Sequence, residues 1–223
     1  MIFKNKQRII STEQVPRLRI NNINIERVHE YRYLGVYLDD SLSWTTHLNY
    51  TSNKISKTNG MLYRLKHMLP KHILTTIYNS LINPYLHYCV LTWGTNTERL
   101  LTLQKRAVRI ITNSHLLAHS DNLFRELKIL KIEDIYKQHQ IIFYHKFLHN
   151  NLPKCISNIL TKQSSQLRSC HSSFFLKPPA RTRTESAKSC IRHTIPNLIN
   201  NYERSFIENL HTYSIPSLKS NLN

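Results

Sequence analysis

Glycine is scarce in this chain of 223 residues, which contains only Gly35, Gly60 and Gly94. Average usage of about 7% would give roughly 15 glycines. Loops that cradle nucleotide phosphates need glycine at fixed spacings, such as GxGxxG or GxxxxGK[ST], and neither pattern occurs. The scarcity therefore excludes a Rossmann-type or Walker-type nucleotide-binding loop.

Cysteine is also infrequent and unpaired in the sequence. The four cysteines are widely spaced and form no CxxC pair, so the pattern predicts neither a disulfide scaffold nor a zinc knuckle. Metal-binding residue types gather only at Cys170, His171, Cys190 and His193, which lack the paired spacing of zinc sites. We therefore predict free thiols and no metal site in this chain.

Long apolar runs are missing as well. No stretch of about 18 apolar residues occurs, so we expect no membrane span and no membrane partner. The first ten residues lack the apolar core and the cleavage site of a secretory signal. We expect an intracellular protein that is not secreted. No compact Lys/Arg-rich import signal occurs, so its location in the nucleus or the cytoplasm stays open.

Acidic residues are outnumbered by basic ones. The chain has 31 Lys and Arg against 13 Asp and Glu, which gives a formal net charge of +18. A basic excess of this size indicates a polyanionic partner, of which nucleic acid is the default. The hydrophobic fraction of 40% argues against a disordered basic tail for most of the chain.

The periodicity of apolar residues changes from strand-like to helix-like near residue 41. Alternation predicts short strands over 17–20 and 23–25 around an Asn21-Asn22 turn, and a third over 31–38. Helical spacing predicts helices over about 44–69, 71–83, 97–112, 121–128, 132–150 and 198–211. The predicted fold class is therefore α+β, a short N-terminal hairpin and strand followed by a mainly α-helical body.

Two of the predicted helices separate apolar from basic residues. On the first, Lys54, Lys57 and Arg64 fall within about 80° of one another, beside an apolar stripe. On the helix over 97–112, the basic residues Arg99, Lys105, Arg106 and Arg109 lie opposite the apolar face. Either arc could be merely solvated, but the charge of the whole chain favours contact with phosphates.

Tyr37-Leu38-Asp39-Asp40 matches the Tyr-x-Asp-Asp signature with which reverse transcriptases hold two magnesium ions. Such a two-metal site needs a further aspartate from another strand. The 36 residues before Tyr37 contain no Asp, and the residues after Asp40 lead into a helix. We therefore interpret Asp39, Asp40, Ser41 and Ser43 as turn and capping residues of that helix and predict no catalytic residue here.

Several sequence elements follow one another in an order that a known family shares. They are Tyr33-Leu34-Gly35-Val36, Trp44-x-x-His47-Leu48, Pro84-Tyr85-Leu86, Trp93-Gly94 and Leu103-Gln104-Lys105-Arg106-Ala107. In this order they resemble the end of the palm and the thumb of reverse transcriptases from jockey-like non-LTR (LINE-type) retrotransposons. The resemblance covers nearly the whole chain and is strongest over 31–130.

The resemblance implies a division of the chain. Residues 1–40 correspond to a palm remnant, 41–160 to a helical thumb and the helical region after it, and 191–223 to a C-terminal segment. The Ser and Lys/Arg content of 161–190 predicts a basic Ser-rich linker between them. In the family the catalytic aspartates and the endonuclease lie upstream, so here they would precede Met1. The chain would then need no cofactor, Mg²⁺ being expected only for the complete polymerase, and whether it is itself an enzyme stays open.

The resemblance also implies roles for individual residues. Tyr33, Leu34, Gly35 and Val36 match the strand called the primer grip, whose backbone approaches the primer end. Trp44 and His47 match the start of the thumb helix. The implied partner is RNA or an RNA–DNA hybrid, and the implied function is that of a reverse transcriptase fragment that does not polymerise alone.

Two other interpretations remain open at this point. The chain could be a stand-alone basic helical protein that binds nucleic acid. It could also be a decayed open reading frame of a retrotransposon without function.

Overall fold

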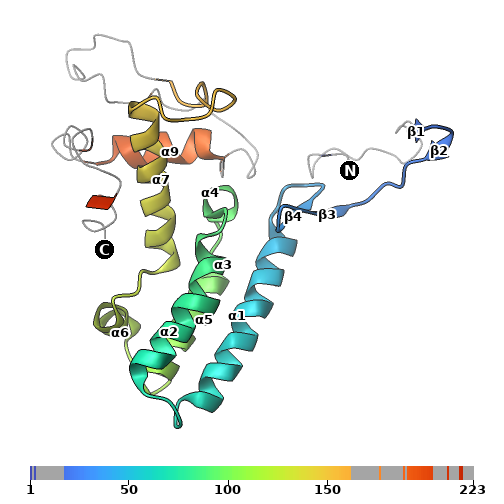
Figure 1. Cartoon of the computed structure of the whole chain (residues 1–223). Coiled ribbons are helices and arrows are strands. Elements are labelled where there is room, and N and C mark those ends of the chain that lie inside the picture. The colour runs from blue at the N-terminus through green and yellow to red at the C-terminus, as the bar shows by residue number, and fades with distance from the viewer. Residues whose placement is uncertain are drawn as a thin grey trace. The chain divides into compact units, whose positions relative to one another are not determined.

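The computed structural model describes residues 1, 3, 18–161, 176, 188, 190–202, 210 and 216–217. It divides into two compact units, Met1–Asn53 and Lys54–Asn223, and the boundary falls inside the first helix. In the described part of the chain, the paired strands belong to the first unit, and most helices belong to the second (Figure 1). The predicted α+β class with a mainly helical body is confirmed.

The first unit contains two antiparallel hairpins. Their strands are β1 (Arg19–Ile20) and β2 (Ile23–Asn24), then β3 (Glu30–Tyr33) and β4 (Val36–Asp39). Asn21 and Asn22 connect β1 to β2 with φ of 50° and 62°, a conformation that asparagine tolerates in two-residue hairpin turns. The turn expected at these asparagines is therefore confirmed.

The prediction of one strand over 31–38 is wrong. The chain folds back at Leu34 and Gly35, whose φ angles are 45° and 84°, so the segment forms a hairpin. Glycine adopts positive φ without steric cost, and two such residues in succession fit a tight hairpin turn. The apolar run alone concealed this turn, because Leu34 is not a typical turn residue.

The helix α1 (Thr45–Leu65) carries an apolar stripe of which Ile55 and Leu62 are fully buried. It ends four residues earlier than the predicted boundary at Leu69, since 66–69 form a turn before Pro70. Within the second unit, the Asn59 amide Nδ2 donates to the Leu103 carbonyl at 2.9 Å. This hydrogen bond ties α1 to the helix α5 (Glu98–Ile111).

Three helices connect α1 to α5 along the chain. They are α2 (Lys71–Leu81), α3 (Asn83–His87) and α4 (Val90–Trp93). Pro84 occupies the first turn of α3, where the missing N–H costs nothing. Cys89 adopts a left-handed conformation, with φ of 51°, and thereby separates α3 from α4. The predicted helix over 71–83 is thus confirmed as α2, whereas α3 and α4 were not predicted.

Further along the chain, the structure contains α6 (Ser120–Leu127), α7 (Ile132–Leu148) and α9 (Ile191–Asn200). The first two match the predicted helices. The predicted start of the helix over 198–211 is wrong, because α9 begins at Ile191 and includes Pro196 in its interior. Proline removes one helical hydrogen bond and therefore argued against a helix at this position. The described part of 203–211 is limited to Leu210.

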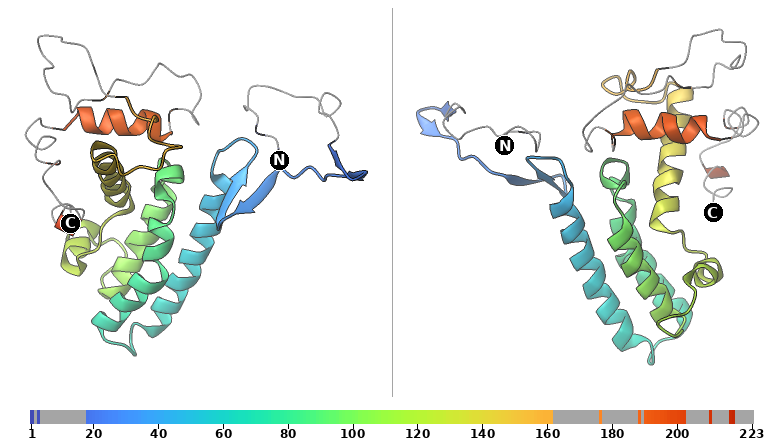
Figure 2. Two further views of the ribbon diagram at one scale, coloured as in Figure 1. Left: turned by 45° about the horizontal axis from the view of Figure 1, so that its top comes forward. Right: turned by 180° about the vertical axis from the view of Figure 1, so that it is seen from behind.

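Side chains of α7 and α9 form much of the apolar core of the second unit. Fully buried members are Ile141 and Tyr144 of α7 and Ile195 and Ile199 of α9. Figure 2 shows α9 lying across one end of α7 in both of its views. No helix among the described residues is long and apolar enough to cross a membrane.

Most of the predicted linker over 161–190 lies outside the described residues. Leu176 is described, and it is fully buried. Its backbone N–H donates to Asn200 Oδ1 at 3.2 Å and its carbonyl accepts from Asn200 Nδ2 at 3.0 Å. The Asn200 side chain on α9 thus forms two hydrogen bonds with the Leu176 backbone, one as acceptor and one as donor, as the backbone of a neighbouring strand would do.

Candidate nucleic-acid interface

One face of α1 presents basic side chains to solvent. Lys54, Lys57 and Arg64 are all exposed. Ile55 and Leu62 lie on the neighbouring arc and are fully buried. The helix therefore packs through its apolar stripe and leaves three cations on the outer side.

The second basic arc runs along α5. This helix packs through Leu100 and Ala107, which are buried. Arg99 and Arg106 are exposed, whereas Lys105 and Arg109 are half-buried. Residues three and four apart are neighbours on a helix surface, so Arg99 and Arg106 flank Leu103, where α1 contacts α5.

Arg109 is partly committed to the fold. Its Nε and Nη2 atoms donate to the Ala118 carbonyl at 3.1 and 2.9 Å. This fork holds the segment between α5 and α6. A guanidinium has five N–H donors, so three remain available to a ligand.

Three acidic residues of the second unit form ion pairs with lysines that belong to neither arc. Lys131 contacts Asp121 at 2.9 Å, Lys137 contacts Asp134 at 3.6 Å, and Lys71 pairs with Glu126. The hydrogen bond from Lys131 is the main cause that lowers the pKa of Asp121. In the described part of the chain, no ion pair involves Lys57, Arg64 or Arg106, so their charges are not neutralised by carboxylates.

The four residues matched to a primer-grip strand lie at the tip of the β3–β4 hairpin. Tyr33 and Leu34 are 59% and 74% exposed, Gly35 forms the turn, and Val36 is buried. A leucine at positive φ is a strained position. The hairpin therefore presents the large side chains of Tyr33 and Leu34 at a tight turn. Their role at a primer end stays a prediction.

The Asp39 carboxylate is occupied by the start of α1. Oδ1 accepts from the backbone N–H groups of Ser41 and Ser43 at 3.1 and 2.8 Å and from Ser41 Oγ at 2.8 Å, while Oδ2 accepts from Ser43 Oγ at 2.8 Å. Burial alone would raise the pKa of Asp39, but these hydrogen bonds outweigh burial and lower the pKa. Asp40 faces His29, whose Nδ1 lies 3.0 Å from Oδ2. The geometry agrees with the predicted turn and capping role.

His47 lies beneath the same hairpin and is 4% exposed. Its Nδ1 accepts from the backbone N–H of Tyr37 at 3.4 Å, so in this contact the ring nitrogen carries no proton. Burial lowers the pKa of His47. The histidine matched to the start of the thumb helix therefore joins β4 to α1 as a neutral group.

Gln104 has a structural role that the sequence did not reveal. Its Nε2 donates to Tyr78 Oη at 2.8 Å and to the Leu130 carbonyl at 2.7 Å. Its Oε1 accepts from the Ile132 N–H at 3.0 Å. One fully buried amide thus joins α2, α5 and the start of α7. The sequence signal that could have revealed this role is a glutamine on the apolar side of a helix whose other residues separate into apolar and basic faces.

The residues considered for a metal lie largely outside the described part, which includes Cys190 and His193 but not Cys170 or His171. The His193 ring nitrogen Nδ1 lies 3.2 Å from Asn197 Nδ2. Among the described residues, no group of three or more His, Cys, Asp or Glu side chains could hold a metal ion.

Comparison with known proteins relates the chain to three polymerases of mobile elements. It is 28% identical over 127 residues to the RNA-directed DNA polymerase from mobile element jockey of Drosophila funebris. It is 23% identical over 138 residues to the probable RNA-directed DNA polymerase from transposon X-element of Drosophila melanogaster, and 24% identical over 129 residues to that from transposon BS of the same organism. The matches cover 53%, 59% and 55% of this chain.

The chain matches about one seventh of the length of these relatives, since the aligned regions cover 14%, 15% and 14% of them. No protein-family model and no solved structure matches. The resemblance to jockey-like RNA-directed DNA polymerases, inferred above from ordered motifs, is thus found independently over more than half of the chain.

Proposed function

We propose that this chain is a reverse-transcriptase-derived fragment that binds RNA or an RNA–DNA hybrid through the basic arcs of α1 and α5. The observation that carries the proposal is the separation of each helix into a buried apolar stripe and an outward basic arc. The relatives are RNA-directed DNA polymerases, and a protein with a net charge of +18 attracts polyanions.

The proposed contacts are made to phosphates and not to base edges. Lysine and arginine on a helix surface recognise the sugar–phosphate backbone without regard to sequence. Lys57, Arg64 and Arg106 suit this role because they are exposed and have no carboxylate partner in the described part of the chain. Arg109 can make fewer contacts with phosphates, because two of its N–H donors are hydrogen-bonded to the Ala118 carbonyl.

The proposal does not include polymerisation by this chain alone. Two-metal phosphoryl transfer needs carboxylates that are free to coordinate the ions. Four donors from Ser41 and Ser43 occupy the Asp39 carboxylate. Magnesium-dependent primer extension by the purified chain, abolished in Asp39→Asn, would contradict this part of the proposal.

The binding arcs are tested by neutralising two of their cations. We expect Lys57→Gln/Arg64→Gln to bind a labelled RNA–DNA hybrid more weakly and to lower the slope of log affinity against log salt by about two. Fluorescence anisotropy over a salt series measures both quantities.

The matched control is Arg125→Gln/Lys146→Gln, which removes the same charge from exposed positions on α6 and α7. An equal loss in both double variants would show that binding depends on net charge and not on the α1 arc. Affinity that does not change with salt would refute phosphate binding altogether.

A further inference from the structure

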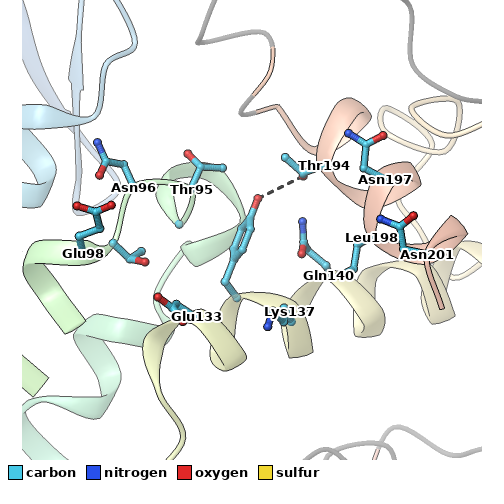
Figure 3. A pocket seen from close by; sticks show the side chains of 13 residues that line it. Thr95, Asn96, Glu98, Glu133, Lys137, Gln140, Thr194, Asn197, Leu198 and Asn201 are labelled. Atoms are coloured by element: carbon cyan, nitrogen blue, oxygen red, sulfur yellow. Dashed lines mark hydrogen bonds between the residues drawn. The ribbon is translucent and has the colours of Figure 1, made fainter. Parts of the chain in front are cut away.

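A pocket of about 560 Å³ lies on the second unit, and none of the basic residues of the two arcs lines it. Its walls come from the segment 94–98 between α4 and α5, from α7, and from α9 (Figure 3). Pockets that bind small molecules usually have volumes of about 300–1,000 Å³. The size is therefore suitable for a ligand that the proposed phosphate contacts do not account for.

Gln140 borders this pocket with a side-chain amide that has no hydrogen-bond partner among the described residues. The residue is 3% exposed, and in the described structure its side chain makes no hydrogen bond. In Figure 3 it extends from α7 toward the side of the pocket formed by Thr194 and Asn197. An amide that faces a pocket and is not used within the fold can donate hydrogen bonds to a ligand and accept them from it.

The other polar groups of the pocket disfavour an anion. Glu98 and Glu133 both line it, and Lys137, the cation among the lining residues, contacts Asp134 at 3.6 Å. Carboxylates repel phosphate but accept hydrogen bonds from amino groups. The pocket therefore suits a neutral ligand that carries both donors and acceptors.

One hydroxyl of the pocket has a fixed role. The Tyr136 hydroxyl donates to Thr194 Oγ1 at 3.2 Å. Burial raises the pKa of Tyr136, so the group stays protonated and keeps this hydrogen bond, which joins α7 to α9. The two helices that carry most of the polar lining are thus held together beside Gln140.

We propose that this pocket binds an unpaired nucleobase with an amino group, delivered by the nucleic acid whose phosphates contact the basic arcs. A primary amide can donate and accept at once, as the edge of a base requires. Carboxylates accept from exocyclic amino groups, and single-stranded RNA is commonly recognised through bases turned out of the stack. The inference rests on the proposed function, since the nucleic acid must bring the base.

A basic side chain from a protein partner is the competing occupant. Its ammonium or guanidinium group would satisfy Glu98 and Glu133. It has no acceptor, however, and would leave the N–H groups of Gln140 unpaired. The need for an acceptor opposite the Gln140 N–H groups therefore favours the base.

The test compares a short single-stranded RNA of mixed sequence with the same RNA made abasic. We expect the wild-type chain to bind the base-bearing RNA about ten-fold more tightly, which is the order of one bidentate base contact. Gln140→Leu should lose most of this ratio and keep the affinity for abasic RNA. The variant should unfold at a temperature close to that of wild type, because the substitution breaks no hydrogen bond among the described residues.

Asn79→Leu serves as the matched control, since it replaces an exposed amide on α2 and should keep the full ratio. Equal affinity of wild type for both RNAs, with steep salt dependence, would overturn the base pocket and leave the proposed function intact. Binding of neither RNA would refute the proposed function and this inference with it. If agmatine, and not cytidine or guanosine, shifts the Gln140 amide signal in NMR spectra, the occupant is a cationic side chain and the inference is wrong.

Discussion

At the scale of single residues, two glutamines on neighbouring helices have opposite surroundings. Gln104 of α5 uses both amide hydrogens and its oxygen within the fold. Gln140 of α7 is equally hidden but has no partner in the described structure. Gln104 therefore stabilises the fold, whereas Gln140 lines the pocket and is available to a ligand.

Gln104→Leu is expected to lower the free energy of unfolding by about 2–4 kcal/mol, because three hydrogen bonds are lost and their partners stay buried. Tyr78→Phe removes one of the three and should cost about 1 kcal/mol. Urea unfolding followed by circular dichroism measures both changes. A loss below about 0.5 kcal/mol for Gln104→Leu would contradict the role given to this amide.

The charge states of Asp39 and His47 predict acid sensitivity in the first unit. The folded pKa of His47 lies below its ordinary 6.5, so stability should decrease as pH falls below that value, where the unfolded chain takes up a proton. The folded pKa of Asp39 lies below its ordinary 3.8, so its contribution is present above 3.8 and is lost as pH falls through the folded pKa.

Hydrogen exchange at the Ser43 amide, corrected for its intrinsic pH dependence, measures this loss. His47→Asn should flatten the change that begins near pH 6.5, and Asp39→Asn should flatten the change at lower pH. His67→Asn is the control because that residue is exposed and takes part in no ion pair among the described residues. Identical pH profiles for wild type and His47→Asn would refute the neutral role of the ring.

At the scale of elements, Gly94 and Gly60 differ in how much space surrounds them. A Cβ on Gly94 would lie 2.5 Å from the Val90 carbonyl oxygen and 2.6 Å from Tyr136 Cδ2. Gly94 therefore permits close contact between the end of α4 and α7. Gly60 lies inside α1 with open space around it, so nothing in the structure requires glycine there.

We expect Gly94→Ala to lower the free energy of unfolding by about 1–3 kcal/mol, since backbone or ring atoms must shift. Gly60→Ala should instead raise it by about 0.5–1 kcal/mol, because alanine favours a helix interior. Thermal unfolding compares the pair directly. Equal effects of the two substitutions would contradict the close contact at Gly94.

At the scale of the whole molecule, the two units differ in how much apolar surface they bury. Among the described residues of the first unit, Val36 is the buried hydrophobic residue, and the other buried side chains there are polar. The second unit buries residues from α2, α5, α7 and α9. A short hairpin with little apolar burial is marginally stable.

The Asp40 amide, which donates to the His29 carbonyl at 3.0 Å, is therefore expected to exchange with solvent at least ten-fold faster than amides in the middle of α5. Hydrogen exchange followed by mass spectrometry or NMR provides the comparison. Equal protection in both units would show that they unfold together.

The sequence determined those features that depend on neighbouring residues. The apolar stripes of α1 and α5 with their basic arcs, the Asn21-Asn22 turn and the capping role of Asp39 follow from spacing and residue type. The resemblance to reverse transcriptases also came from the order of motifs. The start of α9 and the turn at Leu34 were mispredicted, because Pro196 and an exposed leucine are locally atypical.

Tertiary structure decided what depends on residues distant in sequence. Gln104 meets partners 26 and 28 residues away, Gly94 is required by a ring on α7, and the pocket around Gln140 needs α9 beside α7. No local pattern encodes these contacts, because they arise only when separate helices bury their apolar faces together. Even the low glycine count, which excluded phosphate loops, gave no sign that Gly94 would lie against Tyr136.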